Sequence, residues 1–294
     1  MGFIAGLRAR AAALKRTVIF AEGDDGRVRS AAANFVELGL GNAIIVVSPG
    51  ARSADGDGMA FVEAAPADRL AFSHLMVAEG RADACVAGAV HTTAEVIRSA
   101  LKNIGVAPGI KLVSSAFYMV FADRDDIPGD VLTFTDCAVV PYPTAENLRD
   151  IALAAAADRK RIVGDEPRVA LLSFSTHHSA DGTSVDTVRE AVRLIRVRDP
   201  ELLLDGDLQG DAALVAEVAA RKAPGGTLGG KANVLVFPSL DAGNISYKLV
   251  ERLGRAQAIG PILQGLAKPA ADLSRGAGIE DIINVAAVAV LQSL

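Results

Sequence analysis

The chain contains no tryptophan, and aromatic residues make up only 4% of its 294 residues. So few aromatic side chains cannot form a platform on which nucleic-acid bases stack. Basic residues are not in excess either, because 30 Lys and Arg stand against 35 Asp and Glu, a formal net charge of −5. The sequence therefore predicts no nucleic-acid partner and no binding to an anionic membrane surface.

Cysteine is scarce as well. Cys85 and Cys137 lie far apart, each in an apolar run. Such a pair forms neither a disulfide framework nor a CxxC metal pair, so we expect two buried thiols and a cytoplasmic protein. The first residues, MGFIAGLRARAAALKR, place their charges after a short apolar stretch, which is not the order of a signal peptide. No uncharged apolar run approaches the roughly 20 residues of a membrane span.

Apolar residues are abundant, at 51% of the chain with a mean hydropathy of +0.32. Short β-branched runs alternate with stretches whose apolar residues recur at helical spacing, a pattern typical of an α/β fold with a mainly parallel sheet. The predicted strands are Thr17–Ala21, Asn42–Val47, Asp83–Val86, Leu112–Val120, Val169–Ser173, Leu202–Leu204 and Ala232–Phe237. The predicted helices are Arg27–Leu38, Pro66–Ala78, Ala94–Asn103, Ala145–Ala157, Val185–Val197, Ala212–Arg221, Gly243–Leu253 and Gly278–Gln292.

Two segments interrupt this alternation. Residues 48–58 form a polar, Gly-rich loop, and residues 122–143 mix charge, proline and short strand-like runs, which favours a hairpin or a domain crossover. We therefore place a domain boundary near residue 130 and another near Gln264–Ala271. This predicts a discontinuous N-terminal domain, residues 1–130 with 270–294, and a second domain, residues 131–269.

Three polar motifs in the second half of the sequence are better explained without a phosphate-binding or metal site. The segment GGTLGGKA, Gly225–Ala232, nearly matches a P-loop, but it lacks the hydroxyl residue and leads into a strand. Asp205, Asp207 and Asp211 could form a carboxylate cluster for a metal, although a polar strand end followed by a helix start explains them better. His177 and His178 lie in a polar loop without a clear third metal ligand, and we expect no metal site.

Three strand-to-helix junctions carry the residues suited to chemistry. In GAVHTTAEVIRSA, Gly88–Ala100, Thr92 or Thr93 can cap a helix that carries Arg98, and helix amides with one arginine suit an anion. An ordinary N-cap with a solvated arginine explains the same residues. The loop LSFSTHHSADGTS, Leu172–Ser184, is rich in hydroxyls. In Lys268–Val290, Ser274 and Arg275 precede two glycines, and Asp281 lies where the helix dipole alone would stabilise a carboxylate.

These junctions lie within longer stretches of sequence that resemble one protein family. The stretches are FAEGDDGRVRSAA (Phe20–Ala32), VAGAVHTTAEVIR (Val86–Arg98), VSSAF (Val113–Phe117), FTDCAVVPYPTAENL (Phe134–Leu148), RVALLSFST (Arg168–Thr176), LDGDLQGDAA (Leu204–Ala213), KAPGGTLGGKANVLVFPSLDAGNISYKLVERL (Lys222–Leu253) and IGPILQGLAKPAADLSRGAGIEDIIN (Ile259–Asn284). Taken together, the chain resembles the phosphate acetyltransferase family, also called phosphotransacetylases or phosphate acetyl/butyryltransferases. The resemblance implies two α/β domains with a cleft between them, similar to the isocitrate/isopropylmalate dehydrogenase architecture. It also implies a homodimer, with the second domain in the dimer contact.

The implied reaction is reversible: acetyl-CoA and phosphate give acetyl phosphate and CoA, with no metal or other cofactor. By matching position, Asp281 resembles the family aspartate that takes the proton of the CoA thiol, and Ser274 the serine that stabilises the oxyanion. Arg275 and Arg98 match the arginines that hold the phosphoryl group. Further expected substrate-binding residues are the hydroxyl and polar side chains of Thr92, Thr93, Ser175, Thr176, Asn244 and Lys248.

The chain departs from the family between Ser48 and His74, where most members carry a longer helical insert with an arginine implicated in CoA binding. His177 and His178 also stand where members carry other residues. Two alternatives stay open. One is a noncatalytic acetyl-CoA-sensing domain like that of some malic enzymes, and the other is a phosphate butyryltransferase or propionyltransferase.

Overall fold

The computed structural model describes residues 2–122, 127 and 130–294. The chain divides into two compact units, the first formed by Met1–Ile110 with Ile259–Leu294 and the second by Lys111–Ala258. These bounds lie earlier in the sequence than the predicted 1–130 with 270–294 and 131–269. The reason is that the strand before residue 130 pairs with the strand after it, and the chain re-enters the first unit from residue 259, before the predicted boundary at 270. The predicted boundary near 130 adjoins residues 123–126 and 128–129, which lie outside the described residues.

The first unit contains a mostly parallel sheet of order β3-β2-β1-β4-β11-β10, in which only the β10–β11 pair is antiparallel. Its elements are α1 (Phe3–Leu14), β1 (Thr17–Phe20), α2 (Gly26–Glu37), β2 (Asn42–Val47), β3 (Met59–Glu63), α3 (Arg69–Ala78), β4 (Ala84–Ala87), α4 (Thr93–Asn103), β10 (Gln257–Gln264), β11 (Ala270–Asp272) and α10 (Ile279–Gln292).

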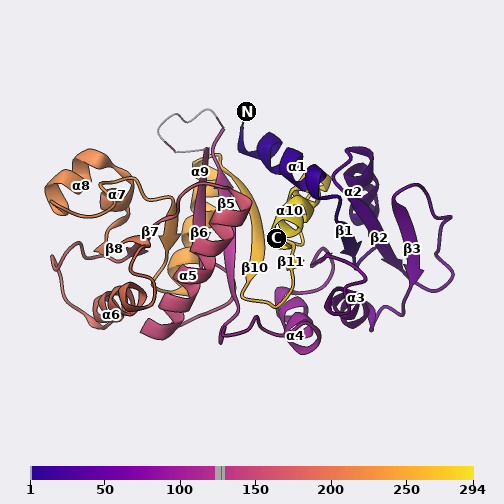
Figure 1. The fold of residues 1–294 in the computed structure, drawn as a ribbon, viewed down its shortest axis with the longest axis horizontal. Coiled ribbons are helices and arrows are strands. Elements are labelled where there is room, and N and C mark those ends of the chain that lie inside the picture. The colour runs from indigo at the N-terminus through magenta and orange to yellow at the C-terminus, as the bar shows by residue number, and fades with distance from the viewer. Residues whose placement is uncertain (1, 123–126, 128–129) are drawn as a thin grey trace. The chain divides into compact units, whose positions relative to one another are not determined.

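Helices cover both faces of this sheet. Helices α3 and α4 lie on one face, and α1, α2 and α10 lie on the other (Figure 1). Strands β1 and β4 are buried almost throughout, as expected for parallel strands covered on two sides. Helix α10 is buried from Ile282 to Leu291, so it forms the centre of its layer.

The second unit repeats the plan with strand order β5-β6-β9-β7-β8, in which only β5 and β6 are antiparallel. Its elements are β5 (Ser114–Val120), β6 (Val131–Thr135), α5 (Ala145–Ile162), β7 (Arg168–Leu172), α6 (Thr183–Arg198), β8 (Leu203–Leu208), α7 (Gly210–Leu214), α8 (Ala216–Lys222), β9 (Val234–Val236) and α9 (Leu240–Leu253). Alternate strand residues enter two cores: Val169 and Leu171 face α5 and α6, whereas Ala170 and Leu172 pack with α7 and α9. For residues 122–143 a hairpin or a domain crossover was expected. Strand β6 from this segment pairs antiparallel with β5, which lies before residue 122.

The helices and strands predicted from the sequence are present in the structure, but some of them begin or end at other residues than predicted. The helix predicted from Pro66 begins at Arg69, after a turn at residues 66–68. The helix predicted at Ala212–Arg221 is two helices, because Val215 takes an extended conformation between them. Helix α1 and strands β3, β10 and β11 were not predicted. Within the described part of the chain, no helix is both long and apolar enough to cross a membrane.

Candidate functional site

Two of the chemistry-bearing segments begin at one edge of the first unit's sheet. Strands β4 and β11 are parallel neighbours, with Ala87 in register with Asp272 at their carboxyl ends. The segment of Thr92, Thr93 and Arg98 follows β4, and the segment of Ser274, Arg275 and Asp281 follows β11. A hydrogen bond joins them, since the Thr93 hydroxyl donates to Asp272 Oδ2 at 2.6 Å. Carboxyl ends of neighbouring parallel strands are where α/β sheets bind ligands.

The turn after β4 is held from inside by Glu22, a residue that is 1% exposed. Its carboxylate accepts hydrogen bonds from the backbone N–H groups of Ala89, Val90 and His91 at 2.7, 3.1 and 2.9 Å. Oε1 also lies 2.7 Å from Nδ1 of the His91 ring. A carboxylate with this many donors fixes the turn, and thereby fixes where helix α4 begins.

Helix α4 starts with a capping box. The Thr92 hydroxyl accepts from Glu95 N at 3.3 Å, and Glu95 Oε2 accepts from Thr92 N at 2.8 Å. The ordinary capping role therefore accounts for Thr92 in the ligand-free protein. Arg98 lies in the second turn of α4, is exposed, and makes no hydrogen bond or ion pair with another described residue.

The loop after β11 presents its side chains to solvent. Ser274 and Arg275 are exposed, and the Ser274 hydroxyl accepts from Gly276 N at 3.3 Å. Asp281, in the first turn of α10, accepts from Gly278 N through Oδ2 at 3.0 Å. The structure therefore confirms that the Asp281 carboxylate lies at the N-terminus of a helix and accepts a hydrogen bond there. This carboxylate is only half-buried, a placement compatible with proton transfer to or from a ligand.

Asp272 is fully buried behind this loop, and its Oδ1 has no hydrogen-bond partner. Burial raises the pKa of Asp272 to about 7, and the nearby charge of Glu22 adds to the rise, while hydrogen bonds from Thr93 and the Leu273 N–H oppose it. This carboxyl group therefore keeps its proton to a much higher pH than an ordinary aspartic acid does.

This shift predicts a pH-dependent stability. Between the ordinary pKa of 3.8 and the folded-state value of about 7, the folded protein keeps a proton that the unfolded chain has lost. The free energy of unfolding therefore falls as pH rises through this window, by about 2–3 kcal/mol between pH 5 and 8. Asp272→Asn should remove that part of the pH dependence, because asparagine does not ionise. Urea unfolding at pH 5, 6, 7 and 8 measures it, with Asp83→Asn as the control. Parallel profiles of wild type and Asp272→Asn would contradict the prediction.

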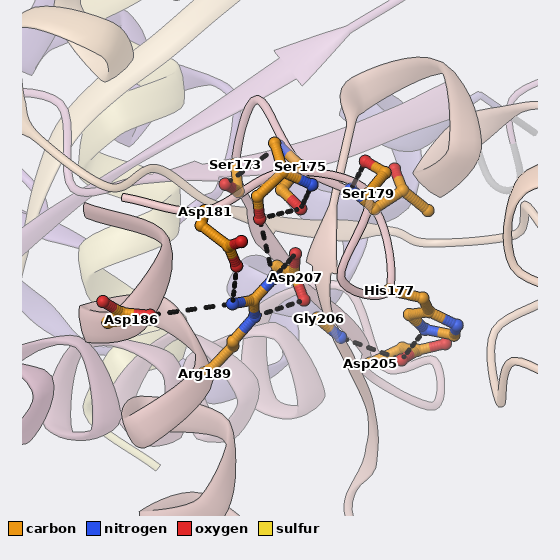
Figure 2. Close-up of polar contacts among 12 residues, drawn as sticks. Ser173, Ser175, His177, Ser179, Asp181, Asp186, Arg189, Asp205, Gly206 and Asp207 are labelled. Carbon is orange, nitrogen blue, oxygen red and sulfur yellow. Dashed lines mark hydrogen bonds and ion pairs between the residues drawn. The ribbon is translucent and has the colours of Figure 1, made fainter. Parts of the chain in front are cut away.

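Ser175 and Thr176 lie in the second unit, in the loop after β7, and both are buried. Figure 2 shows Ser175 in this loop. The Ser175 hydroxyl accepts from Ala180 N at 3.1 Å, and Thr176 Oγ1 accepts from Gln209 N at 2.9 Å. Both hydroxyls therefore stabilise the loop in the ligand-free protein, and their predicted substrate role stays a prediction.

Arg189 of helix α6 lies below this loop, among three carboxylates (Figure 2). Its guanidinium is 3.4 Å from buried Asp207, and 3.2 and 3.6 Å from exposed Asp181 and Asp186. Burial alone would raise the pKa of Asp207, but hydrogen bonds from Ser175 and Arg189 lower it. The Asp207 carboxylate is thus a charged anchor for the loop.

The remaining polar motifs of the second unit also have protein partners. His177 Nε2 lies 2.9 Å from Asp205 Oδ1, and His177 has a positive φ of 44°, as the tight turn requires (Figure 2). Asp211 pairs with Lys222 at 2.8 Å. Among the residues that the structure describes, no group of three or more His, Cys, Asp or Glu is arranged to hold a metal ion.

Asn244 and Lys248 lie on helix α9. The Asn244 amide donates to the Cys137 carbonyl at 3.0 Å, and the Lys248 ammonium lies 4.9 Å from the centre of the Tyr247 ring. In the described part of the second unit, no hydrogen bond or ion pair joins them to Ser175 or Thr176.

Sequence reasoning missed Glu22, Arg27 and Asp272 as parts of the first unit's site. The Arg27 guanidinium donates hydrogen bonds to the carbonyls of Ala89, Arg275 and Ala277. In the sequence, only the positions of these residues pointed to a role. Glu22 and Arg27 follow the first strand, in the segment EGDDGR, and Asp272 immediately precedes Leu273 and Ser274. Buried carboxylates at the ends of strands that converge on one sheet edge are the feature that could have identified them.

Both the sequence and the fold are similar to those of known proteins. A family model described as phosphate acetyl/butaryl transferase matches residues 51–290. The phosphate acetyltransferase of Clostridium acetobutylicum is 50% identical over 226 residues, which cover 77% of this chain and 68% of that protein. The solved phosphotransacetylase of Streptococcus pyogenes superimposes with a TM-score of 0.89 at 36% identity, over 99% of this chain and 98% of that one.

The fold is shared more widely. A 4-hydroxythreonine-4-phosphate dehydrogenase structure from Salmonella typhimurium matches with a TM-score of 0.58 at 13% identity, covering 95% of this chain and 99% of that one. At this identity the likeness concerns the fold alone. It agrees with the predicted α/β class and its mostly parallel strands, and with a dehydrogenase-like architecture.

Proposed function

Because the chain belongs to the phosphate acetyl/butaryl transferase family, we propose that it is an acyltransferase that moves an acetyl group reversibly between CoA and phosphate. In one direction, the CoA thiolate sulfur forms a bond to the carbonyl carbon of acetyl phosphate. The carbon–oxygen bond to the phosphoryl group then breaks, and phosphate leaves with the bonding electron pair. The products are acetyl-CoA and phosphate, and the thiol proton is accepted by a base.

Four residues of the first unit fit the steps of this reaction. A thiol that titrates near pH 8.5 is mostly protonated at pH 7, so Asp281 serves as the base that raises the thiolate fraction. The Ser274 hydroxyl donates to the carbonyl oxygen as it becomes an oxyanion. Arg275 and Arg98 hold the phosphoryl group, for which a guanidinium offers paired N–H donors.

The observation that carries the proposal is the pairing of β4 with β11. Two segments that lie far apart in the sequence leave the sheet side by side, joined by Thr93 and Asp272 at 2.6 Å. One segment carries an arginine, and the other carries a hydroxyl, an arginine and a carboxylate within eight residues, from Ser274 to Asp281. An oxyanion donor, anion-binding cations and a base are the groups that acyl transfer to a thiol requires.

Three finer features belong to the same proposal. Thr92, Thr93, Ser175, Thr176, Asn244 and Lys248 are expected to contact CoA or acetyl phosphate after rearrangement of their present hydrogen bonds. The interdomain cleft also stays a prediction, and small-angle scattering with and without CoA tests it. A fluorescent fusion tests the cytoplasmic location, for which the two buried thiols are the argument.

Thioester absorbance on mixing the protein with acetyl phosphate and CoA tests the function. A rise that scales with protein concentration is expected. A flat trace from folded protein that binds acetyl-CoA would favour the noncatalytic sensor. Comparing kcat/KM for acetyl, propionyl and butyryl phosphate measures the acyl preference, where one methylene is worth roughly 1–3 kcal/mol.

We further propose that the second unit mediates a homodimer through helix α9. Ile245, Leu249 and Leu253 recur at four-residue spacing on this helix, and they are 57%, 52% and 80% exposed. Tyr247, which stacks on Phe117 with ring centres 4.0 Å apart, holds the other side of the helix to β5. An exposed apolar stripe on a well-anchored helix is typical of a subunit contact.

This contact predicts the behaviour of a charged variant. Leu249→Glu should convert the dimer into a monomer in sedimentation equilibrium, because a carboxylate would be buried in an apolar contact. Val197→Glu is the matched control, since Val197 is 72% exposed on α6 of the same unit. A Leu249→Glu protein that remains dimeric would exclude α9 from the contact.

A further inference from the structure

Arg27 makes an unusually complete set of hydrogen bonds in the first turn of helix α2. Nε and Nη2 donate to the two carboxylate oxygens of Asp25 at 3.1 and 2.8 Å. Nη1 donates to the carbonyls of Arg275 and Ala277, each at 2.9 Å, and Nη2 also donates to the Ala89 carbonyl at 3.3 Å. A guanidinium has five N–H donors, so each of them has an acceptor on the protein.

These bonds join three separate segments of the first unit. Asp25 caps α2 by accepting from Arg27 N at 2.8 Å, which ties the side chain to the start of that helix. Ala89 belongs to the turn that Glu22 holds after β4. Arg275 and Ala277 flank Gly276, so the same guanidinium holds the backbone on both sides of a glycine, a residue type with wide conformational freedom.

An arginine beside an anion site would ordinarily be assigned to the anion. Arg27 is different, because its donors are already committed to the Asp25 carboxylate and to three carbonyls. Its side chain is 36% exposed, and that of Asp25 is 16% exposed. The Arg27 hydrogen bonds also lower the pKa of Asp25, which keeps this carboxylate charged. The arrangement is that of a structural clamp and not of a substrate ligand.

We propose that Arg27, held by Asp25, is a positioning residue for acyl transfer: it locks the loop of Ser274 and Arg275 against the turn that leads to Arg98. This inference rests on the proposed function of the same site. Ser274 and Arg275 are exposed. Apart from the Thr93–Asp272 hydrogen bond at the end of β11, the Arg27 guanidinium is the link between their loop and the turn after β4 among the described residues, so its two carbonyl bonds help to set where the side chains of Ser274 and Arg275 point. Misplacing a catalytic group by about 1 Å can cost about 10²-fold in rate.

Arg27→Lys tests the clamp, because lysine keeps the charge but offers three donors from a single nitrogen, which cannot span Asp25 and three carbonyls. Arg29→Lys is the matched control. Arg29 lies on the same helix and donates to the Gly23 carbonyl at 3.0 Å, and no hydrogen bond or ion pair joins its side chain to either segment among the described residues. Asp25→Asn is a milder second variant, since asparagine still caps the helix but no longer pairs with the guanidinium.

Two readouts are measured on each full-length variant. In hydrogen–deuterium exchange, Arg27→Lys should increase exchange at residues 274–278 and 89–91, whereas Arg29→Lys should match wild type. In the acetyl phosphate and CoA assay, Arg27→Lys should lower kcat by about 10- to 100-fold, with KM for CoA within threefold of wild type. Asp25→Asn should also increase exchange in these residues and lower kcat, but each effect should be smaller than in Arg27→Lys.

The outcomes separate this inference from the proposed function. Unchanged exchange in Arg27→Lys overturns the clamp, whatever the activity. Increased exchange with unchanged kcat overturns the positioning role. If Arg27→Lys does not fold, Asp25→Asn decides both points, and wild-type values in it overturn the inference. A wild-type protein without acetyl transfer overturns the proposed function and the catalytic part of the inference, while exchange still decides whether the clamp exists.

Discussion

Replacing Asp281 by asparagine is expected to lower kcat for acetyl transfer to CoA at pH 7 by about 10²–10⁴-fold, the usual contribution of a general base. The fold should survive, because an asparagine side-chain oxygen can still accept the hydrogen bond that Asp281 Oδ2 takes from Gly278 N at 3.0 Å. The lost rate should return with pH. As the CoA thiol ionises near pH 8.5 without help, kcat/KM of the variant should rise about tenfold per pH unit below that value.

Glu280→Gln is the control for Asp281→Asn. Glu280 is the neighbouring carboxylate in the same helical turn, and it pairs with Arg8 at 2.5 Å. Its substitution removes the same charge from the same helix N-terminus and should leave kcat near wild type. If Asp281→Asn turns over within threefold of wild type at pH 7, or shows no rise with pH, Asp281 is not the base.

Arg275→Ala and Arg98→Ala should each raise KM for acetyl phosphate by about 10- to 100-fold, because a hydrogen bond to a charged group is worth about 1.5–3 kcal/mol. Both residues are exposed, and neither side chain has a hydrogen-bond or ion-pair partner among the described residues, so little stability should be lost. KM for CoA should change less. Steady-state kinetics with each substrate varied in turn measures the split.

Two further variants sharpen this test. Lysine at either position keeps the charge but loses the paired donors, so its effect should lie between wild type and alanine. Lys102→Ala removes one exposed charge from the last turn of the helix that carries Arg98, and it should alter neither KM. A selective rise in KM for CoA would reassign the arginine concerned to CoA.

Strands β1 and β2 could be predicted from the sequence to within a residue. Residues 17–20 and 43–47 are continuous apolar or β-branched runs, because a parallel strand covered on both faces needs them. Strand β11 was not predicted because it has only three residues, and β10 was not predicted because Gly260 and Pro261 interrupt it. Helix α1 was not predicted because alanine dominates its apolar residues and marks no clear apolar face.

Candidate site residues could be selected from the sequence only where residues of suitable chemistry stand within one segment. Ser274, Arg275 and Asp281 stand together in a short glycine-containing stretch, and Arg98 follows a recognisable helix start. Arg27 acts through contacts 248 and 250 residues away in the sequence, and Glu22 through contacts about 70 residues away. No local pattern marks such partners, because their roles depend on the order of strands β1, β4 and β11 in the sheet.

The central claim is that the protein transfers the acetyl group itself from phosphate to CoA. The most direct measurement incubates wild-type protein with acetyl phosphate and CoA and determines phosphate released and acetyl-CoA formed in the same samples. The account predicts equal amounts of both products, formed only when CoA is present, and a loss of both in Asp281→Asn at pH 7. Phosphate released without acetyl-CoA, or no product from folded protein that binds acetyl-CoA, would contradict it.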